Sequence, residues 1–249
     1  MRRAPDWMIQ VVAVVLIVAL WEWAARAGHL NPFYAPAPSA IWTTLAALFA
    51  GGEIWPHIVA TFGAALIGLA IGALIGTVLA ALAVMVHWVE ILLAPLMGAL
   101  NAVPRIVLAP LLVIWFGIGV ASKAALAVLL VAVLMFFAVF SAVAGVDRRL
   151  IERVQTLGGG RWLVLREVYL PSVASLMLSS LKVAVGFAFT GAIVGEFVAS
   201  SRGLGYLLSF AQSTYNTALS LALVGLIMAF VMALLGIASK LERRLTQWR

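Results

Sequence analysis

The chain has 249 residues, of which 65% are hydrophobic and 10% are charged, and its formal net charge is +7. Its mean hydropathy of +1.16 lies far above that of a soluble globular domain. The composition therefore excludes an ordinary soluble enzyme or binding module. The absence of cysteine excludes disulfides, thiolate chemistry and cysteine-based metal sites.

Long uncharged stretches identify the chain as an integral membrane protein. Residues 58–86, 124–146 and 203–239 carry no formal charge and are 29, 23 and 37 residues long. At about 1.5 Å per helical residue, each covers the roughly 30 Å hydrocarbon core of a bilayer. Lysine and arginine gather at a few loops and ends, as membrane topology requires, rather than along a nucleic-acid-binding face.

The hydropathy pattern predicts an all-α membrane protein with six transmembrane helices in a single domain, residues 1–249. The predicted spans are Trp7–Ala25, Ile58–Val86, Ile91–Phe116, Ala124–Val146, Ser172–Phe197 and Ala218–Ser239. An additional short helix on the membrane surface is expected at Ile41–Phe49, between the first two spans.

The N-terminal stretch has two interpretations. Its basic start, apolar run and small residues at Ala25–Ala27 resemble a cleavable signal peptide. The run is long, however, and contains Trp7, Trp21, Glu22 and Trp23, of which the tryptophans suit a membrane interface. We therefore favour a retained first span.

The distribution of basic residues predicts that both termini are cytoplasmic, because cytoplasmic loops carry the excess of lysine and arginine. This orientation leaves Arg26, Lys123 and Arg202 outside, and Arg105 and Lys182 within or near spans. The eleven residues placed inside are Arg2, Arg3, Arg148, Arg149, Arg153, Arg161, Arg166, Lys240, Arg243, Arg244 and Arg249.

The second span carries a stripe of small residues at intervals of four. These residues are Ala64, Gly68, Gly72, Gly76 and Ala80. Such a stripe lets another helix approach closely, backbone to backbone. We interpret it as a packing surface rather than as part of a transport pathway.

The third span contains features that a membrane helix rarely tolerates. Pro104, Arg105 and Pro110 interrupt an apolar segment that ends in Trp115 and Phe116. Irregular backbone and charge at membrane depth are tolerated when they line a cavity or are buried in protein. The alternative is that the segment starts at the interface, where Arg105 reaches the headgroups. The two aromatics could narrow a pathway or belong to the core or interfacial belt.

The fifth span contains two further candidates for a pathway or gate, Phe187 and Glu196. Glu196 could instead hold a polar network together. Lys182 is expected to reach the interface or to pair with a carboxylate. Because no two histidines lie at ligand spacing, we predict no metal site.

A charged, glycine-rich segment, residues 147–171, separates the fourth and fifth spans. Leu150, Val154 and Leu157 fall on one face of a predicted helix over 147–157. Three glycines, 158–160, then end that helix, and a second short helix is predicted to follow before Pro171 starts the next span. This helix–turn–helix could anchor on headgroups or present a rigid surface to a soluble partner.

The segment resembles the "EAA" loop of permeases from ATP-binding-cassette (ABC) importers. Glu152, Gly158 and Leu170–Pro171 match E-A-A-x-x-x-G followed by I-x-L-P, whereas Arg153 and Val154 replace the two alanines. The phrases "PAPSAIW", "VPRIVLAPLLVIWFGIGVASK" and "VGEFVASSRGLGYLL" occur in the order typical of the nitrate, sulfonate, taurine and bicarbonate branch. The resemblance therefore covers nearly the whole chain.

The resemblance implies a non-catalytic type I permease subunit in the bacterial cytoplasmic (inner) membrane. It implies a homodimer of permease chains, two ATPase subunits that bind ATP and magnesium, and an external solute-binding protein. This chain would bind no cofactor or nucleic acid, and it has no G-x-x-x-x-G-K-[ST] phosphate loop. The residues expected to contact the ATPase are Glu152, Leu157, Gly158, Gly159, Gly160, Arg161, Trp162 and Pro171.

The sequence does not distinguish among nitrate, sulfonates, taurine, bicarbonate and heteroaromatic vitamin precursors as the substrate.

Two other classes of membrane protein fit the sequence less well. A self-sufficient secondary transporter would show repeated halves, but the first three spans have no counterpart to the charged segment. An intramembrane hydrolase would need a nucleophile beside a base within a span, and no G-x-S-x-G motif occurs.

Overall fold

The computed structural model describes residues 6–246, apart from the side chains at 6–7, 105, 161, 175, 241 and 243–246. No strand occurs in this part of the chain. The helices are α1 (Asp6–Arg26), α2 (Pro38–Ala50), α3 (Trp55–Met85), α4 (His87–Ala102), α5 (Arg105–Phe116), α6 (Val120–Ala144), α7 (Arg148–Thr156), α8 (Arg161–Val164), the π-helical turn η1 (Leu165–Tyr169), α9 (Leu170–Val198), α10 (Leu204–Ser213) and α11 (Thr217–Thr246).

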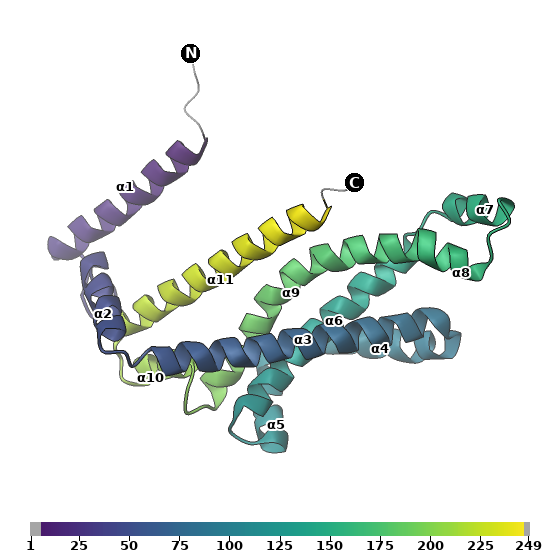
Figure 1. Ribbon diagram of the computed structural model, residues 1–249. Helices are drawn as coiled ribbons and strands as arrows, with labels where there is room; N and C mark the ends of the chain where they lie inside the picture. Colours follow the sequence, from purple (N-terminus) through teal and green to yellow (C-terminus); the bar gives the residue numbers. More distant parts are fainter. Residues whose placement is uncertain (1–5, 247–249) are drawn as a thin grey trace, which may run out of the picture.

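Helices α3, α6 and α9 form the centre of the molecule, and each packs against the other two (Figure 1). Alanine is the commonest side chain where they meet, which lets the backbones approach closely. The buried cluster consists of Ala64, Ala65, Val131, Met135, Ala184, Ala188, Phe189 and Ala192. Small residues therefore line the helix crossings, and a few larger side chains, such as Met135 and Phe189, fill the space beside them.

The stripe of small residues on α3 lies against α6. A Cβ atom added at Gly68 would overlap the Cβ of Ala127, and one added at Gly72 would lie 2.7 Å from the carbonyl oxygen of Val128. Gly76 is equally close to the backbone of α6. Glycine is therefore required at these positions by the short distance between the two helices.

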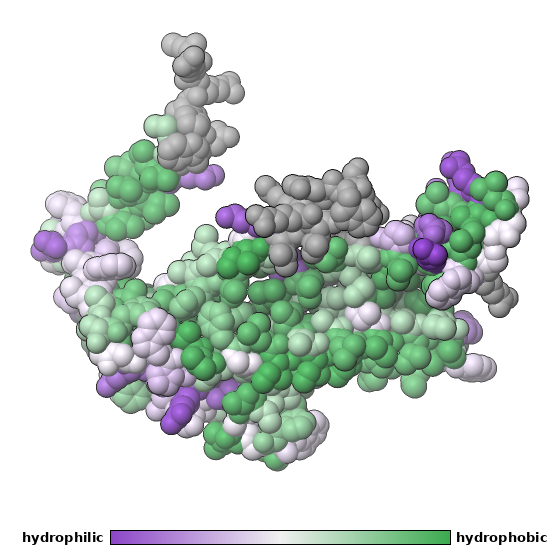
Figure 2. Space-filling view, viewed as in Figure 1, coloured by the Kyte–Doolittle hydropathy of each residue, from purple (hydrophilic) through white to green (hydrophobic). Residues whose placement is uncertain are grey.

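Five helices among residues 6–246 are long and apolar enough to cross a membrane, and the pair α4–α5 makes a sixth if it counts as one span. Figure 2 shows apolar residues over most of the visible face, with hydrophilic residues gathered towards its two ends. Helix α1 stands apart from the central helices and packs mainly against α2 (Figure 1). The all-α, multi-span fold predicted from the sequence is confirmed.

The third span, predicted as an irregular segment over Ile91–Phe116, is divided into two helices. The segment consists of α4 and α5, which are bent by 108° relative to each other. The break falls at Val103 and Pro104, both with extended ψ angles. The proline ring restricts the residue before it to extended conformations, so α4 ends there and α5 starts in a new direction. Pro110 lies inside α5 and leaves it helical.

The second short helix predicted in the charged segment is not separate. Helix α8 continues through η1 into α9, so residues 161–198 form one uninterrupted helical rod (Figure 1). Pro171 therefore lies within this rod and does not begin it. A proline ring clashes with the carbonyl four residues earlier. That carbonyl belongs to Glu167, in the wider π-helical turn, which accommodates the ring.

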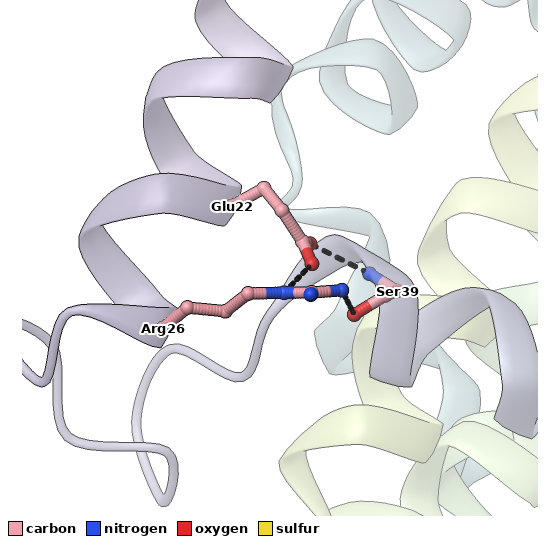
Figure 3. A network of polar contacts seen from close by, with 3 residues as sticks. All are labelled: Glu22, Arg26 and Ser39. Carbon is pink, nitrogen blue, oxygen red and sulfur yellow. Dashed lines mark hydrogen bonds and ion pairs between the residues drawn. The ribbon is translucent and has the colours of Figure 1, made fainter.

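A polar contact fixes the start of α2 against the end of α1 (Figure 3). The carboxylate of Glu22 accepts hydrogen bonds from the Arg26 guanidinium and, at 3.0 Å, from the backbone N–H of Ser39. That N–H is one of the first of α2, where no carbonyl of the same helix is available to accept it. Helix α2 is the short helix that the sequence predicted between the first two spans.

Candidate functional site

The structure places the predicted ATPase-coupling residues and Glu196 at two opposite ends of the central helices. One end carries residues 147–171, here called the elbow, which include α7, α8 and η1. The other end carries α2 and α10 (Figure 1). Helix α9 connects the elbow to α10.

Helix α7 of the elbow begins and ends with well-formed caps. The Asp147 side chain accepts a hydrogen bond from the Arg149 N–H at 2.9 Å, which satisfies an amide at the start of α7. At the other end, the N–H groups of Gly158 and Gly159 donate to the carbonyls of Gln155 and Val154, both at 2.9 Å. This pair of bonds is a Schellman motif, and it requires the positive φ of +82° that Gly158 adopts.

Gly159 joins the two arms of the elbow. A Cβ atom added there would lie 2.6 Å from Val154 Cγ1 of α7 and 2.9 Å from Leu163 Cδ2 of α8. Together with the cap at Gly158, this close packing fixes the turn between α7 and the rod that starts at residue 161. The angle between α7 and α8 is therefore held by packing contacts from both helices at Gly159.

The tip of the elbow exposes large apolar side chains beside charged ones. Leu157 is 82% exposed and Trp162 is 71% exposed. Glu152 is also exposed, as are Gly158 and Gly160. Arg161 begins α8, but its side chain is outside the described residues. A small, rigid, partly apolar surface of this kind suits contact with another protein.

The predicted pathway residues do not form one constriction within this chain. Trp115 and Phe116 are exposed on α5 and line an open apolar hollow of about 590 Å³ between α3, α4, α5 and α6. Phe187 packs instead against the buried cluster of the central helices. Pro104 lies at the break before α5, and the Arg105 side chain is outside the described residues.

Glu196 lies in a buried polar network at the far end of α9. Its side chain is 1% exposed. Its Oε2 atom accepts hydrogen bonds from the Thr61 hydroxyl and from the Gly205 N–H, both at 2.9 Å. Of the two interpretations open from the sequence, pathway or polar network, the structure places Glu196 in the network.

The same network holds the N-terminus of α10. Besides Gly205, the N–H of Gly203 donates to Nδ1 of His57 at 3.0 Å, and the N–H of Leu204 donates to Thr61 Oγ1 at 2.9 Å. Three consecutive amides, which have no acceptor within α10 itself, are thus capped by side chains from α3 and α9. Both glycines are needed, because a Cβ atom at either would overlap Glu196 or the backbone of α9.

Lys123 completes this arrangement, although the sequence placed it in an external loop. Helix α6 starts at Val120, before the predicted boundary, so Lys123 is inside the helix and only 4% exposed. Its Nζ donates to the carbonyl of Arg202 at 3.1 Å, in the turn before α10. We call His57, Thr61, Lys123, Glu196 and the backbone of 202–205 the polar cluster.

Thr61 and Lys123 were missed as members of a site by reasoning from the sequence. The only signal was that each is a polar residue in a strongly apolar helix. Thr61 and Glu196 are 135 positions apart, so only the folded structure brings them together. Lys182 does lie near a carboxylate, with its Nζ 3.9 Å from Glu242 of α11.

Several basic residues used to predict the orientation are outside the described part of the chain. Arg2, Arg3 and Arg249 are outside it entirely, and the side chains of Arg161, Arg243 and Arg244 are outside it as well.

Known proteins resemble this chain along most of its length. Residues 68–247 match the family described as "Binding-protein-dependent transport system inner membrane component". The riboflavin transport system permease protein RibX of Chloroflexus aurantiacus is 33% identical, over 95% of this chain and 88% of that protein. A putative aliphatic sulfonates transport permease protein, SsuC of Bacillus subtilis, is 29% identical over 100% of this chain and 90% of that protein.

Solved structures share the fold at lower identity. An amino acid ABC transporter chain superposes with a TM-score of 0.68 at 16% identity, covering 80% of this chain and 97% of that chain. The MetNI methionine ABC transporter gives a TM-score of 0.62 at 18% identity, covering 78% and 94%. The chain belongs to the binding-protein-dependent transport system inner membrane components, and it is a membrane-spanning, non-catalytic permease subunit of an ATP-driven ABC importer.

Proposed function

We propose that the elbow is the surface through which this permease receives mechanical work from a separate ATPase subunit. The observation that supports this proposal most strongly is the geometry of the elbow tip. Leu157 and Trp162 are exposed, while the Schellman motif at Gly158 and the close packing at Gly159 hold the turn rigid. A rigid apolar tip transmits a displacement to the helix that follows it, whereas a flexible loop would change shape without displacing that helix.

The continuous rod, residues 161–198, supports this role. A displacement at Trp162 enters a helix that continues into the central packing of α3, α6 and α9. We infer that the elbow is cytoplasmic, with both termini on the same side. This orientation agrees with the excess of lysine and arginine in the elbow and near both ends of the chain.

The assembled importer is expected to contain two permease chains, two ATPase subunits and an external solute-binding protein. A single chain has one elbow and therefore contacts one ATPase, so a two-fold pair suits a pair of ATPases. ATP and Mg²⁺ are expected on the ATPase, since this chain has no phosphate-binding loop of the G-x-x-x-x-G-K-[ST] type.

The transported solute is proposed to be small, and its identity to be set mainly by the binding protein. Relatives that share this chain's length are named for riboflavin, aliphatic sulfonates, formylaminopyrimidine and taurine. These solutes differ widely in size and charge, while the permeases named for them share one family. We therefore place this chain's substrate among nitrate, sulfonate- or taurine-like solutes and heteroaromatic vitamin precursors.

The proposed docking surface is tested by replacing Trp162 with alanine. Because this side chain is exposed in the chain, its loss leaves the permease folded, but it removes an aromatic anchor from the ATPase interface. Truncation of such an anchor weakens binding by about 2 kcal/mol or more, which is at least roughly thirtyfold. The measurement is the affinity of the purified cognate ATPase for the permease in lipid nanodiscs.

Trp42→Ala serves as the matched control, since Trp42 is 69% exposed at the opposite end of the molecule. It should bind the ATPase with wild-type affinity. Equal affinity of the Trp162→Ala variant and the wild type would remove the elbow tip from the ATPase interface.

A further inference from the structure

The polar cluster joins three spans and one short helix at a single point. His57 and Thr61 come from α3, Lys123 from α6 and Glu196 from α9, and all of them hold the N-terminus of α10 or the turn before it. Their hydrogen bonds reach four consecutive residues, 202–205. Helix α10 is therefore attached to the ends of all three central helices.

The cluster is costly to open. Glu196 and Lys123 are both almost completely buried, and ionisable groups removed from water are costly unless they are hydrogen-bonded. The N-terminus of α10 also favours a carboxylate, because its free N–H groups give that end a partial positive charge. Moving α10 away from both α3 and α9 would remove the Gly205 N–H from the Glu196 carboxylate and would leave three backbone amides without their side-chain partners. These energetics favour a cluster that stays closed while the surrounding helices move.

The cluster also lies at the far end of the rod that starts in the elbow. Glu196 is 26 residues beyond Leu170 in the same helix, which corresponds to about 39 Å at 1.5 Å per residue. Helix α6 also runs between the elbow and the polar cluster, from Ala144 to Lys123, but only α9 continues into the elbow as part of one unbroken helical rod. A displacement of the elbow end of α9 therefore has a continuous, stiff route to α10.

We propose that Glu196 and Thr61 are positioning residues that make α10 move as one body with α9. Movement delivered at the elbow would then reach the opposite, external face of the importer through α10 rather than being lost at the end of the span. In this proposal Glu196, which is 1% exposed, acts through α10 rather than by contact with the solute. The inference rests on the proposed role of the elbow, but the cluster can be tested without the ATPase.

The test uses two spin labels on this cysteine-free chain, at Thr190→Cys in α9 and Ser213→Cys in α10, both exposed positions. Labelled chains are diluted with unlabelled ones in nanodiscs, so that distances within one chain are measured. We expect a narrow distribution of the 190–213 distance that is the same without ATPase, with ATPase, and with ATPase trapped by ATP and vanadate. A change of this distance on trapping would overturn the proposal, and that comparison needs no substitution in the cluster.

Variants at Thr61 test the hydrogen bonds themselves. Thr61→Val removes the hydroxyl that donates to Glu196 and accepts from Leu204. Leaving two buried partners unsatisfied should shift the equilibrium towards detached α10 by about tenfold, and so broaden the 190–213 distribution. Thr61→Ser keeps the hydroxyl and should restore the narrow distribution. Thr44→Val is the matched control, because the Thr44 hydroxyl donates only to a carbonyl of its own helix, α2.

Transmission of the movement to the external face is measured as the distance between spin labels on the two permease chains. With one label per chain at Ser213→Cys, the distance between the two copies should change on trapping with ATP and vanadate in the wild type and in Thr61→Ser. In Thr61→Val the change should be smaller and its distribution broader, although ATPase binding stays at wild-type strength. A response of Thr61→Val equal to that of Thr44→Val, or no response in the wild type, would contradict the proposal. Failure of the elbow itself would appear separately, as unchanged ATPase affinity in Trp162→Ala.

Discussion

At the scale of single residues, glycine does most to bring functional groups together in this permease. Gly203 has a φ of +128°, a conformation that side chains with a Cβ atom rarely adopt. Its α-carbon also lies so close to Glu196 that an added Cβ would overlap the carboxyl group. Gly205 is equally close to the backbone of α9 at Ile193. The "RGLG" sequence is therefore what lets the amides of α10 reach the buried carboxylate.

Gly203→Ala should destabilise the protein by roughly 2–4 kcal/mol, because backbone strain and overlap with Glu196 act together. Thermal unfolding in detergent, followed by circular dichroism, measures this effect. Gly225→Ala provides the control: nothing lies within 4 Å of the Cβ added at Gly225, and its φ is not positive. A Gly203→Ala variant as stable as Gly225→Ala would mean that α10 does not approach Glu196 in this way.

At the scale of helices, the small-residue stripe of α3 and its contact with α6 determine the core. The sequence predicted this stripe correctly as a close-packing pattern, since a four-residue repeat of glycine and alanine is visible without any structure. The partner helix could not be predicted, because nothing in the repeat distinguishes α6 from the other spans. The bend of 108° between α4 and α5 also could not be predicted from the sequence. Pro104 indicated a break, but the direction of the chain after it depends on packing against α6 and α9.

Gly72→Ala should weaken the contact between α3 and α6, because the new methyl group would lie 2.7 Å from the Val128 carbonyl oxygen and 2.8 Å from Val131 Cβ. We expect a loss of about 1–3 kcal/mol in unfolding free energy, measured by denaturant titration in mixed micelles. Gly98→Ala in α4, where the added Cβ meets nothing within 4 Å, should keep or slightly raise the stability. The packing of the stripe would be refuted if both alanine variants behaved alike.

At the scale of the whole molecule, the chain is a set of apolar helices with polar functional groups at its two ends. The membrane character, the all-α multi-span fold and the position of the elbow in the chain could be predicted from composition, hydropathy and the "EAA"-like spacing. The polar cluster could not, because Thr61, Lys123 and Glu196 lie in three different spans and meet only after folding. Reading Lys123 as a loop residue was a consequence of placing the boundary of α6 at the first uncharged position.

The continuity of residues 161–198 also emerges only at this scale. Glycines and a proline flank residues 161–170, a pattern typical of an isolated surface helix. In the structure this stretch extends a span instead, and one rod reaches from the elbow to α10. The elbow and the polar cluster are thus the two ends of one mechanical element.

Contact between the elbow and the ATPase is measured most directly by site-specific cross-linking from the elbow tip, in membrane vesicles that contain the complete importer. A cysteine-reactive photo-cross-linker is attached at Leu157→Cys, which is unambiguous because the chain has no other cysteine. We predict a cross-link to the ATPase subunit from Leu157→Cys and none from Trp42→Cys at the opposite end of the molecule. Cross-links from Leu157→Cys to lipid or to an external binding protein, with none to the ATPase, would contradict it.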